Sequence, residues 1–195
     1  MNEIRSVCVY SASSTRVADV YVEAARELGR TLALRGIRLV NGAGSLGLMR
    51  ECADACLSAG GKVTGVIPRF MVEQGWQHDG LTELIVTEDM HTRKQTMARL
   101  SDAVIALPGG CGTMEELLEI ITWKQLGLYL NPVVILNTGG YYDPLLRMLA
   151  HAAEERFMRK SHLDIWKTAS SVSGAVDLLY TIPRWDESVR KFAAI

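Results

Sequence analysis

Short apolar runs alternate with helical periods along almost the whole chain, and this alternation restricts the possible folds more than any other feature. Nearly continuous apolar strands separated by helices are typical of a parallel sheet that is covered on both faces. The expected strands are 6–11, 37–41, 62–67, 83–87, 103–107, 133–136 and, more weakly, 165–168. The expected helices are 17–35, 46–58, 90–100, 113–126, 143–157 and 172–181, with 70–82 a loop or short helix. We therefore predict an α/β fold, a Rossmann-like, doubly wound parallel sheet of six to seven strands.

The size and charge of the chain exclude several classes of protein. Its 195 residues suit one domain, 1–195, with a tail from about residue 185 that we expect to be loose. The net charge of −1 excludes the basic surface of a dedicated nucleic-acid binder. No apolar run has the length of a membrane span, and the N-terminus lacks the order of a signal peptide. The four cysteines lack metal-ligand spacing, so we expect reduced thiols, no bound metal and a cytoplasmic location.

The first glycine-rich turn, Gly42 to Gly47, fits the pattern G-x-G-x-x-G between a predicted strand and a predicted helix. In such sheets ligands bind at the carboxyl ends of the strands, where free backbone N–H groups attract anions. A dinucleotide site would also need an acid at the end of the next strand, but Arg69 stands there. NAD is therefore disfavoured. The turn either holds a phosphorylated ligand or merely packs a helix on the sheet.

The second turn, Pro108 to Glu116, has three glycines in four positions, which let a ligand approach the backbone closely. We expect Thr113 to cap the following helix, so that a phosphate is held by its hydroxyl and by the N–H groups of Gly112 and Thr113. No G-K-[S/T] sequence follows, which excludes an ordinary ATP-binding loop. Glu116 has two interpretations: a capping-box partner of Thr113, or a carboxylate beside the sugar of a bound nucleotide.

Arg93 and Lys94 lie together at the start of a predicted helix. Two cations there are unfavourable with the helix dipole, and an anionic partner would offset that cost. The alternative is a solvated basic face. Neighbouring His91 is not expected to be catalytic.

These motifs together resemble the LONELY GUY family of cytokinin-activating nucleoside 5′-monophosphate phosphoribohydrolases, whose members are often labelled lysine decarboxylases. The family pattern P-G-G-x-G-T-x-x-E stands at 108–116, and M-x-x-R-K-x-x-M…S-D stands at 90–102. Further matches are the stretch 115–127, the N-x-x-G-Y-Y of 137–142 and the glycine turn 41–50, and the similarity covers most of 5–180. Asn41, Ala43 and Arg50 replace glycines of the family, at positions that the resemblance places along the nucleotide pocket.

The resemblance implies hydrolysis of the N-glycosidic bond of AMP-like or N6-substituted adenosine 5′-monophosphates, giving free base and ribose 5-phosphate. That is chemistry of the AMP nucleosidase type, which serves either cytokinin biosynthesis or nucleotide salvage. It assigns catalysis to Glu116, which stabilises an oxocarbenium-like ribose and activates water, and to Arg93, which assists the departing purine. Residues expected to bind the substrate or its phosphate are Gly109, Gly110, Gly112, Thr113, Lys94, Met90, Gly44, Ser45 and Ser13.

Neither a cofactor nor a metal is expected. True decarboxylation would need a lysine that binds pyridoxal phosphate together with a partner for its pyridinium nitrogen, and we find no such set. Two other classes stay open: a non-catalytic carrier that binds a nucleotide or phosphosugar, and an NADP-linked enzyme that reads the 2′-phosphate with Arg69.

The helix from Met114 to Leu128 is apolar on nearly every side. Such a helix must be covered all round. A second subunit would do this, as the resemblance to a family of homodimers or larger assemblies implies, and we expect a homodimer. The alternative is burial beneath the C-terminal helices. The apolar residues are Met114, Leu117, Leu118, Ile120, Ile121, Trp123, Leu126 and Leu128.

Overall fold

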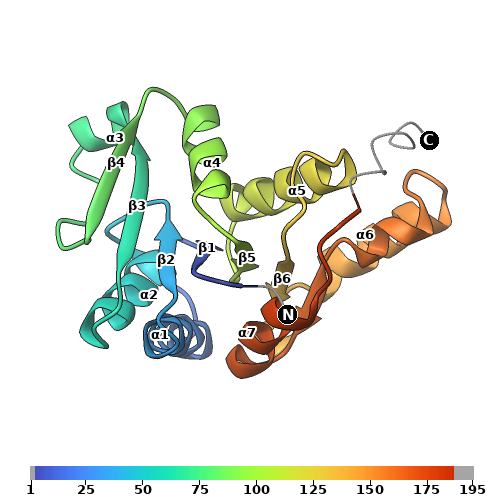
Figure 1. The fold of residues 1–195 in the computed structure, drawn as a ribbon, viewed down its shortest axis with the longest axis horizontal. Helices are drawn as coiled ribbons and strands as arrows, with labels where there is room; N and C mark the ends of the chain where they lie inside the picture. Colours follow the sequence, from blue (N-terminus) through green and yellow to red (C-terminus); the bar gives the residue numbers. More distant parts are fainter. Residues whose placement is uncertain (1–2, 187–195) are drawn as a thin grey trace.

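The computed structural model describes residues 3–186, and one seven-stranded sheet runs through it (Figure 1). Its spatial order is β4-β3-β2-β1-β5-β6-β7, and all six pairings are parallel. The predicted fold class is confirmed. The strands are β1 Ser6–Tyr10, β2 Arg38–Asn41, β3 Val63–Pro68, β4 Glu83–Thr87, β5 Ala103–Ala106, β6 Val133–Leu136 and β7 Lys167–Ala169.

The order of the strands reverses at β1. From β1 the chain moves outward to β4 on one side, then returns to β5 and continues to β7 on the other. Such a reversal leaves a crevice beyond the carboxyl ends of the two central strands, and open α/β sheets bind their ligands there. Both glycine-rich turns lie at this edge, because one follows β2 and the other follows β5.

Helices cover both faces of the sheet (Figure 1). Helices α1 (Asp19–Leu34), α2 (Gly47–Ser58) and α7 (Val172–Thr181) pack on one face. Helices α4 (Met90–Arg99), α5 (Cys111–Gln125) and α6 (Asp143–Glu154) pack on the other. The shorter elements are α3 (Arg69–Glu73) and two 3₁₀ helices, Thr138–Gly140 and Lys160–Asp164. Within the described residues no helix combines the length and the hydropathy needed to cross a membrane.

Strand β1 explains the continuous apolar runs of the sequence. Val7 and Val9 face the α1 layer, whereas Cys8 and Tyr10 face the α5 layer, and all four are buried. Successive side chains of a strand point to opposite faces, so a strand covered on both faces is apolar at every position.

Helix boundaries differ from the prediction where local backbone geometry decides them. Helix α5 begins at Cys111, two residues before the expected start, because Gly110 occupies the N-cap position. Thr113 is therefore the third residue of the helix, and its prediction as the cap is wrong. Helix α6 ends at Glu154 rather than at residue 157, because Arg156 has a φ of 66° and cannot continue it. The predicted loose tail lies mostly outside the described residues.

Lys124 of α5 is an unusual component of the core. Its side chain is buried, and Nζ donates a hydrogen bond to the Asn131 carbonyl at 2.7 Å. The Trp185 ring lies 5.7 Å from Nζ. Burial lowers the pKa of Lys124 to about 8, because the charged form loses its hydration.

The buried lysine predicts a pH-dependent stability. Between pH 8 and 10.5 the folded chain has released the Lys124 proton while the unfolded chain still holds it. The unfolded state then binds more protons, so raising the pH favours folding, by at most about tenfold in the equilibrium constant per pH unit. Urea unfolding of the wild type and of Lys124→Met at several pH values measures this. The wild type must gain stability relative to the variant across the window; a constant difference would contradict the assignment.

Candidate active site

A buried ion pair joins the two halves of the sheet at the point where the strand order reverses. Nη1 of Arg93, on α4, donates to Oε1 of Glu116, on α5, at 3.3 Å. Arg93 is 6% exposed and Glu116 is 7% exposed, so both charges are almost fully removed from water. The structure therefore brings together the two residues that the sequence assigns to catalysis.

Backbone carbonyls accept hydrogen bonds from the other two nitrogens of the Arg93 guanidinium. Nε donates to the Val66 carbonyl of β3 at 3.0 Å, and Nη2 donates to the Gly42 carbonyl of the first glycine turn at 3.3 Å. The thioether of Met90 lies 3.9 Å from Nη1. Arg93 thus fixes the glycine turn, β3 and α5 relative to one another.

Glu116 is not a capping residue. Gly110 takes the cap of α5, and the Glu116 carboxylate faces Arg93 instead of returning to Thr113. Burial raises the pKa of Glu116 to about 7, although the neighbouring Arg93 charge opposes this shift. The carboxyl is thus poised to change its protonation state near neutral pH.

Lys94, like Arg93, contacts helix α5, but it hydrogen-bonds carboxylates other than that of Glu116. Its buried ammonium donates to Glu115 and, at 3.1 Å, to Glu119. Burial alone would lower the pKa of Lys94, but these two hydrogen bonds hold it above its usual value. Asp89 caps α4 by accepting from the Thr92 N–H at 2.7 Å. Side chains of the protein thus supply the anionic partners expected for the two cations, and a phosphate contact of Lys94 stays a prediction.

The second glycine turn is tied down by two tyrosines. Tyr141 donates its hydroxyl to the Gly109 carbonyl at 2.7 Å, and Tyr142 donates to the Leu107 carbonyl at 2.7 Å. Both tyrosines belong to the N-x-x-G-Y-Y motif, but the sequence analysis assigned neither of them a role. The spacing of the motif does not indicate which group a tyrosine hydroxyl will hydrogen-bond. These contacts fix the turn in front of α5.

The three glycines of this turn serve different purposes. A Cβ on Gly109 would lie 2.1 Å from Thr113 Oγ1 and 2.5 Å from Thr113 Cβ. Cβ atoms on Gly110 and Gly112 would meet nothing within 4 Å. Gly109 is therefore required by packing, whereas Gly110 and Gly112 leave the start of α5 open to a ligand.

The first glycine turn keeps its shape despite two replaced glycines. Asn41 Oδ1 accepts from the Ala43 N–H at 2.9 Å, and Ala43 adopts a φ of 59°. A short asparagine side chain stabilises such turns by hydrogen-bonding the backbone two residues ahead. Arg50 lies exposed on α2 and pairs with Asp54, and it does not line the cavity described below, contrary to the expectation for this position.

A cavity of about 380 Å³ opens between this turn and Arg93. Of the predicted site residues, Ser13, Gly44, Ser45 and Arg93 line it. Met71 and Trp76 form an apolar part of its lining. Both come from the 70–82 region, which the sequence predicted as a loop or short helix without assigning it a role in the site.

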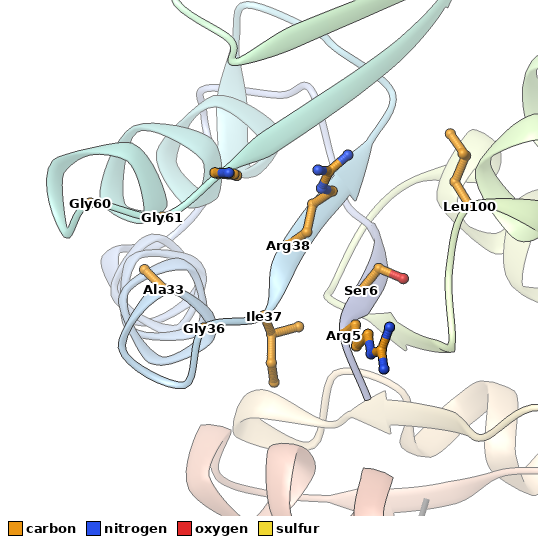
Figure 2. Close-up of a pocket in the computed structure, with 10 residues that line it drawn as sticks. Arg5, Ser6, Ala33, Gly36, Ile37, Arg38, Gly60, Gly61 and Leu100 are labelled. Atoms are coloured by element: carbon orange, nitrogen blue, oxygen red, sulfur yellow. The ribbon is translucent and has the colours of Figure 1, made fainter. Parts of the chain in front are cut away.

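A second cavity, of about 530 Å³, lies at the opposite edge of the sheet (Figure 2). Arg5, Arg38 and Lys62 line it at the amino ends of β1, β2 and β3, and none of the predicted site residues does. Arg5 pairs with Glu3, and Arg38 pairs with Glu83. This cavity is remote from the crevice where such sheets bind their ligands, so the smaller cavity beside Arg93 is the candidate active site.

Comparison with known proteins agrees with the motifs. Residues 49–179 match the family model described as "Possible lysine decarboxylase". A probable cytokinin riboside 5′-monophosphate phosphoribohydrolase of Oryza sativa subsp. japonica is 43% identical over 187 residues, which is 96% of this chain and 82% of the relative. The chain belongs to the family of this model, which includes the cytokinin riboside 5′-monophosphate phosphoribohydrolases. A second rice relative is 48% identical over 160 residues, and these cover 82% of this chain but 66% of the relative.

Bacterial and structural relatives extend the likeness. A cytokinin riboside 5′-monophosphate phosphoribohydrolase of Rhodococcoides fascians is 43% identical, over 88% of this chain and 87% of its own. Among solved structures, the molybdenum cofactor carrier protein of Chlamydomonas reinhardtii matches with a TM-score of 0.71 and 24% identity, covering 92% of this chain and 98% of its own. That identity supports the shared fold alone.

One face of α5 remains uncovered in the single chain. Leu118, Leu126 and Leu128 are exposed, the last by 65%, and α7 packs on the opposite face of the sheet. Helix α6 packs on the same face of the sheet as α5, yet in the part of the chain that the structure describes these three leucines stay exposed. Among residues 3–186, no cluster of His, Cys, Asp or Glu could hold a metal ion.

The glycine turn after β5 yields a matched pair of variants. Gly109→Ala forces a methyl group into Thr113, so we expect a loss of about 1–3 kcal/mol in the free energy of unfolding. Gly110→Ala adds its methyl group in open space and should cost less than about 1 kcal/mol, the ordinary penalty of alanine at a helix N-cap. Urea unfolding compares the two. Equal losses would contradict the packing role of Gly109.

Proposed function

We propose that this protein hydrolyses the N-glycosidic bond of AMP-like or N6-substituted adenosine 5′-monophosphates, releasing the base and ribose 5-phosphate. The observation that carries the proposal is the buried Arg93–Glu116 pair between the two glycine turns. A protein that only stores a nucleotide gains nothing from burying a carboxylate next to the sugar. The names of the enzyme relatives support the same reaction.

Glu116 acts on the ribose. Breaking the N-glycosidic bond builds positive charge on the sugar, and an ionised carboxylate beside it stabilises that charge. The same carboxylate accepts a proton from the attacking water. Because the side chain is almost fully buried, its charge is weakly screened and acts more strongly than it would in water.

Arg93 acts on the base and on Glu116. Its guanidinium borders the cavity beside the glycine turn, and there it offsets the negative charge that the departing purine acquires. Its position is fixed before substrate arrives, because Val66, Gly42 and Glu116 already hold three of its nitrogens. Little reorganisation is then needed in the transition state.

The start of α5 is the binding site that we propose for the phosphate. The first N–H groups of a helix have no partner within the helix, and the dipole makes that end attractive to anions. Gly110 and Gly112 leave room for an oxygen to approach the backbone. Binding energy from this remote group positions the ribose against Glu116.

The uncovered face of α5 is proposed to be the contact of a homodimer. Leucines exposed along one helix are expensive to leave in water, and a second copy of the chain offers a matching surface. We also propose a cytoplasmic location and a role in cytokinin biosynthesis. Four free cysteines agree with a reducing compartment.

A non-catalytic carrier is the competing function, since a molybdenum cofactor carrier shares the fold. Incubating the protein with AMP separates the two. Release of adenine and ribose 5-phosphate supports the hydrolase, whereas tight binding of intact AMP supports the carrier.

Replacing the carboxylate should abolish turnover. Glu116→Gln keeps the size of the side chain but loses the charge, so we expect kcat to fall by about 10²–10³ or more while AMP still binds. Full activity would return Glu116 to a structural role. Glu115→Gln is the matched control on the same turn of α5, and its kcat should stay within about threefold of the wild type.

The rate should fall in acid. Because only the ionised Glu116 is active, kcat/KM should drop about tenfold per pH unit below its pKa of about 7. The substrate phosphate also titrates, near pH 6, so a variant must identify the group. The Glu115 charge helps to raise the Glu116 pKa. Glu115→Gln should therefore move the acid limb to lower pH, whereas an unmoved limb would assign it to the substrate.

The phosphate should be indispensable. Without it, the α5 terminus contributes no binding energy to the positioning of the ribose, so we expect kcat/KM for adenosine to be at least about 100-fold below that for AMP. Product release from both substrates, followed by chromatography, measures the ratio. Equal cleavage of the two would rule out the phosphate site.

A further inference from the structure

The segment 69–80 forms the outer side of the candidate pocket but has almost no anchorage in the core. None of the residues of α3 is buried, and Trp76 is 52% exposed although it lines the cavity with Met71. Segments with few buried apolar contacts open easily. Polar contacts must therefore hold Trp76 in place.

Backbone hydrogen bonds join this segment to the first glycine turn. The Ser45 N–H donates to the Trp76 carbonyl at 3.0 Å, and the His78 N–H donates to the Ala43 carbonyl at 2.8 Å. Gly44 and Gln77 form an isolated antiparallel bridge between them. The segment and the turn that borders Arg93 thus form one unit.

His78 fastens this unit to α2. Its side chain is 11% exposed, and Nε2 lies 2.7 Å from Asp54 Oδ1. The Gly80 N–H donates to Nδ1 at 2.9 Å, so Nδ1 accepts and Nε2 carries the hydrogen that Asp54 accepts. Both ring nitrogens are used, and the imidazole closes the loop 78–80 while it ties the loop to a helix.

We propose that His78 is a positioning residue for the base pocket. Through Asp54 it holds the segment 74–80 so that Trp76 and Met71 stay against the cavity, where they contact an apolar substituent on the base. The proposal rests on the proposed function and extends it. It names His78 as the residue on which the preference for N6-alkylated substrates over AMP depends.

The geometry limits the effect to one part of the substrate. The His78–Asp54 contact involves neither Glu116 nor the turn before α5, so the chemical step and the phosphate site are untouched. Loosening Trp76 removes an apolar wall and exposes the substituent to water. Binding of an N6-alkylated nucleotide should weaken, while AMP, which lacks the substituent, should bind nearly as before.

Steady-state kinetics of His78→Ala test this with AMP and N6-(3-methylbut-2-enyl)adenosine 5′-monophosphate. For the alkylated substrate we expect KM to rise about tenfold, with kcat within about twofold. For AMP, KM should change by less than about threefold. His78→Gln, whose amide keeps a donor toward Asp54, should restore most of the selectivity. Equal effects on both substrates, or a loss confined to kcat, would overturn the proposal.

Arg50→Ala is the matched control. Arg50 is the other partner of Asp54, with Nε 3.1 Å from Oδ2, and lies exposed on α2 away from the cavity. Its removal leaves the His78–Asp54 contact, so selectivity should persist. A loss of selectivity equal to that of His78→Ala would assign the effect to the Asp54 charge instead.

A double-mutant cycle connects His78 to Trp76. If His78 acts through Trp76, adding His78→Ala to Trp76→Ala should cause little further rise in KM for the alkylated substrate. Fully additive effects would overturn the proposal.

Amide hydrogen exchange gives a readout that needs no activity. His78→Ala should speed exchange in 74–80 and leave α5 unchanged. Unchanged exchange in 74–80 would contradict the positioning role of His78. If the wild type cleaves neither nucleotide, the proposed function fails, and exchange still decides whether His78 holds the segment.

Discussion

The arrangement of the site depends on one constraint, the burial of the Arg93 guanidinium. A buried cation is stable only when it is paired and hydrogen-bonded. Val66, Gly42 and Glu116 meet this need from three separate segments of the chain. Losing Glu116 would leave the charge uncompensated, and losing either carbonyl would leave a buried N–H without an acceptor. The cation therefore fixes the positions of β3, the first glycine turn and α5. The same demand accounts for Gly42, because a Cβ there would lie 1.8 Å from Nη2 of Arg93.

Glu116 experiences two opposing effects, and their balance suits a catalytic carboxylate. Burial disfavours its ionised form, whereas Arg93 favours it, and burial prevails enough to place the pKa at about 7. A carboxylate paired with arginine in water would stay ionised and weakly basic. A buried one without arginine would stay protonated at neutral pH. Together the two effects give a base that is about half ionised at neutral pH, and whose ionised form is able to accept a proton from water.

Regular elements were predictable from the sequence because local pattern determines them. Strand β4 and helix α7 have the predicted ends, and the parallel order follows from helices that separate apolar strands. Side-chain partners were not predictable, because they join segments far apart in the chain. Spacing left Glu116 as a cap or a catalyst, and it could not show that Glu116 faces Arg93 of α4 or that Lys94 meets Glu115 and Glu119 of α5. The pocket wall at Met71 and Trp76 was missed because only the five-residue helix α3 and the irregular stretch after it form this wall.

The replaced glycines show which positions of the first turn need glycine for structural reasons and which do not. At 43 the turn needs a left-handed backbone, and Ala43 adopts one because Asn41 hydrogen-bonds its N–H. The methyl group of Ala43 has room because position 65 is a glycine, where a second Cβ would lie 2.6 Å from that of Ala43. At position 47 glycine cannot be replaced in this way, because a Cβ would lie 2.4 Å from the Ser13 carbonyl carbon. The family pattern therefore relaxes where a neighbouring side chain can support the backbone, and stays fixed where another backbone fills the space.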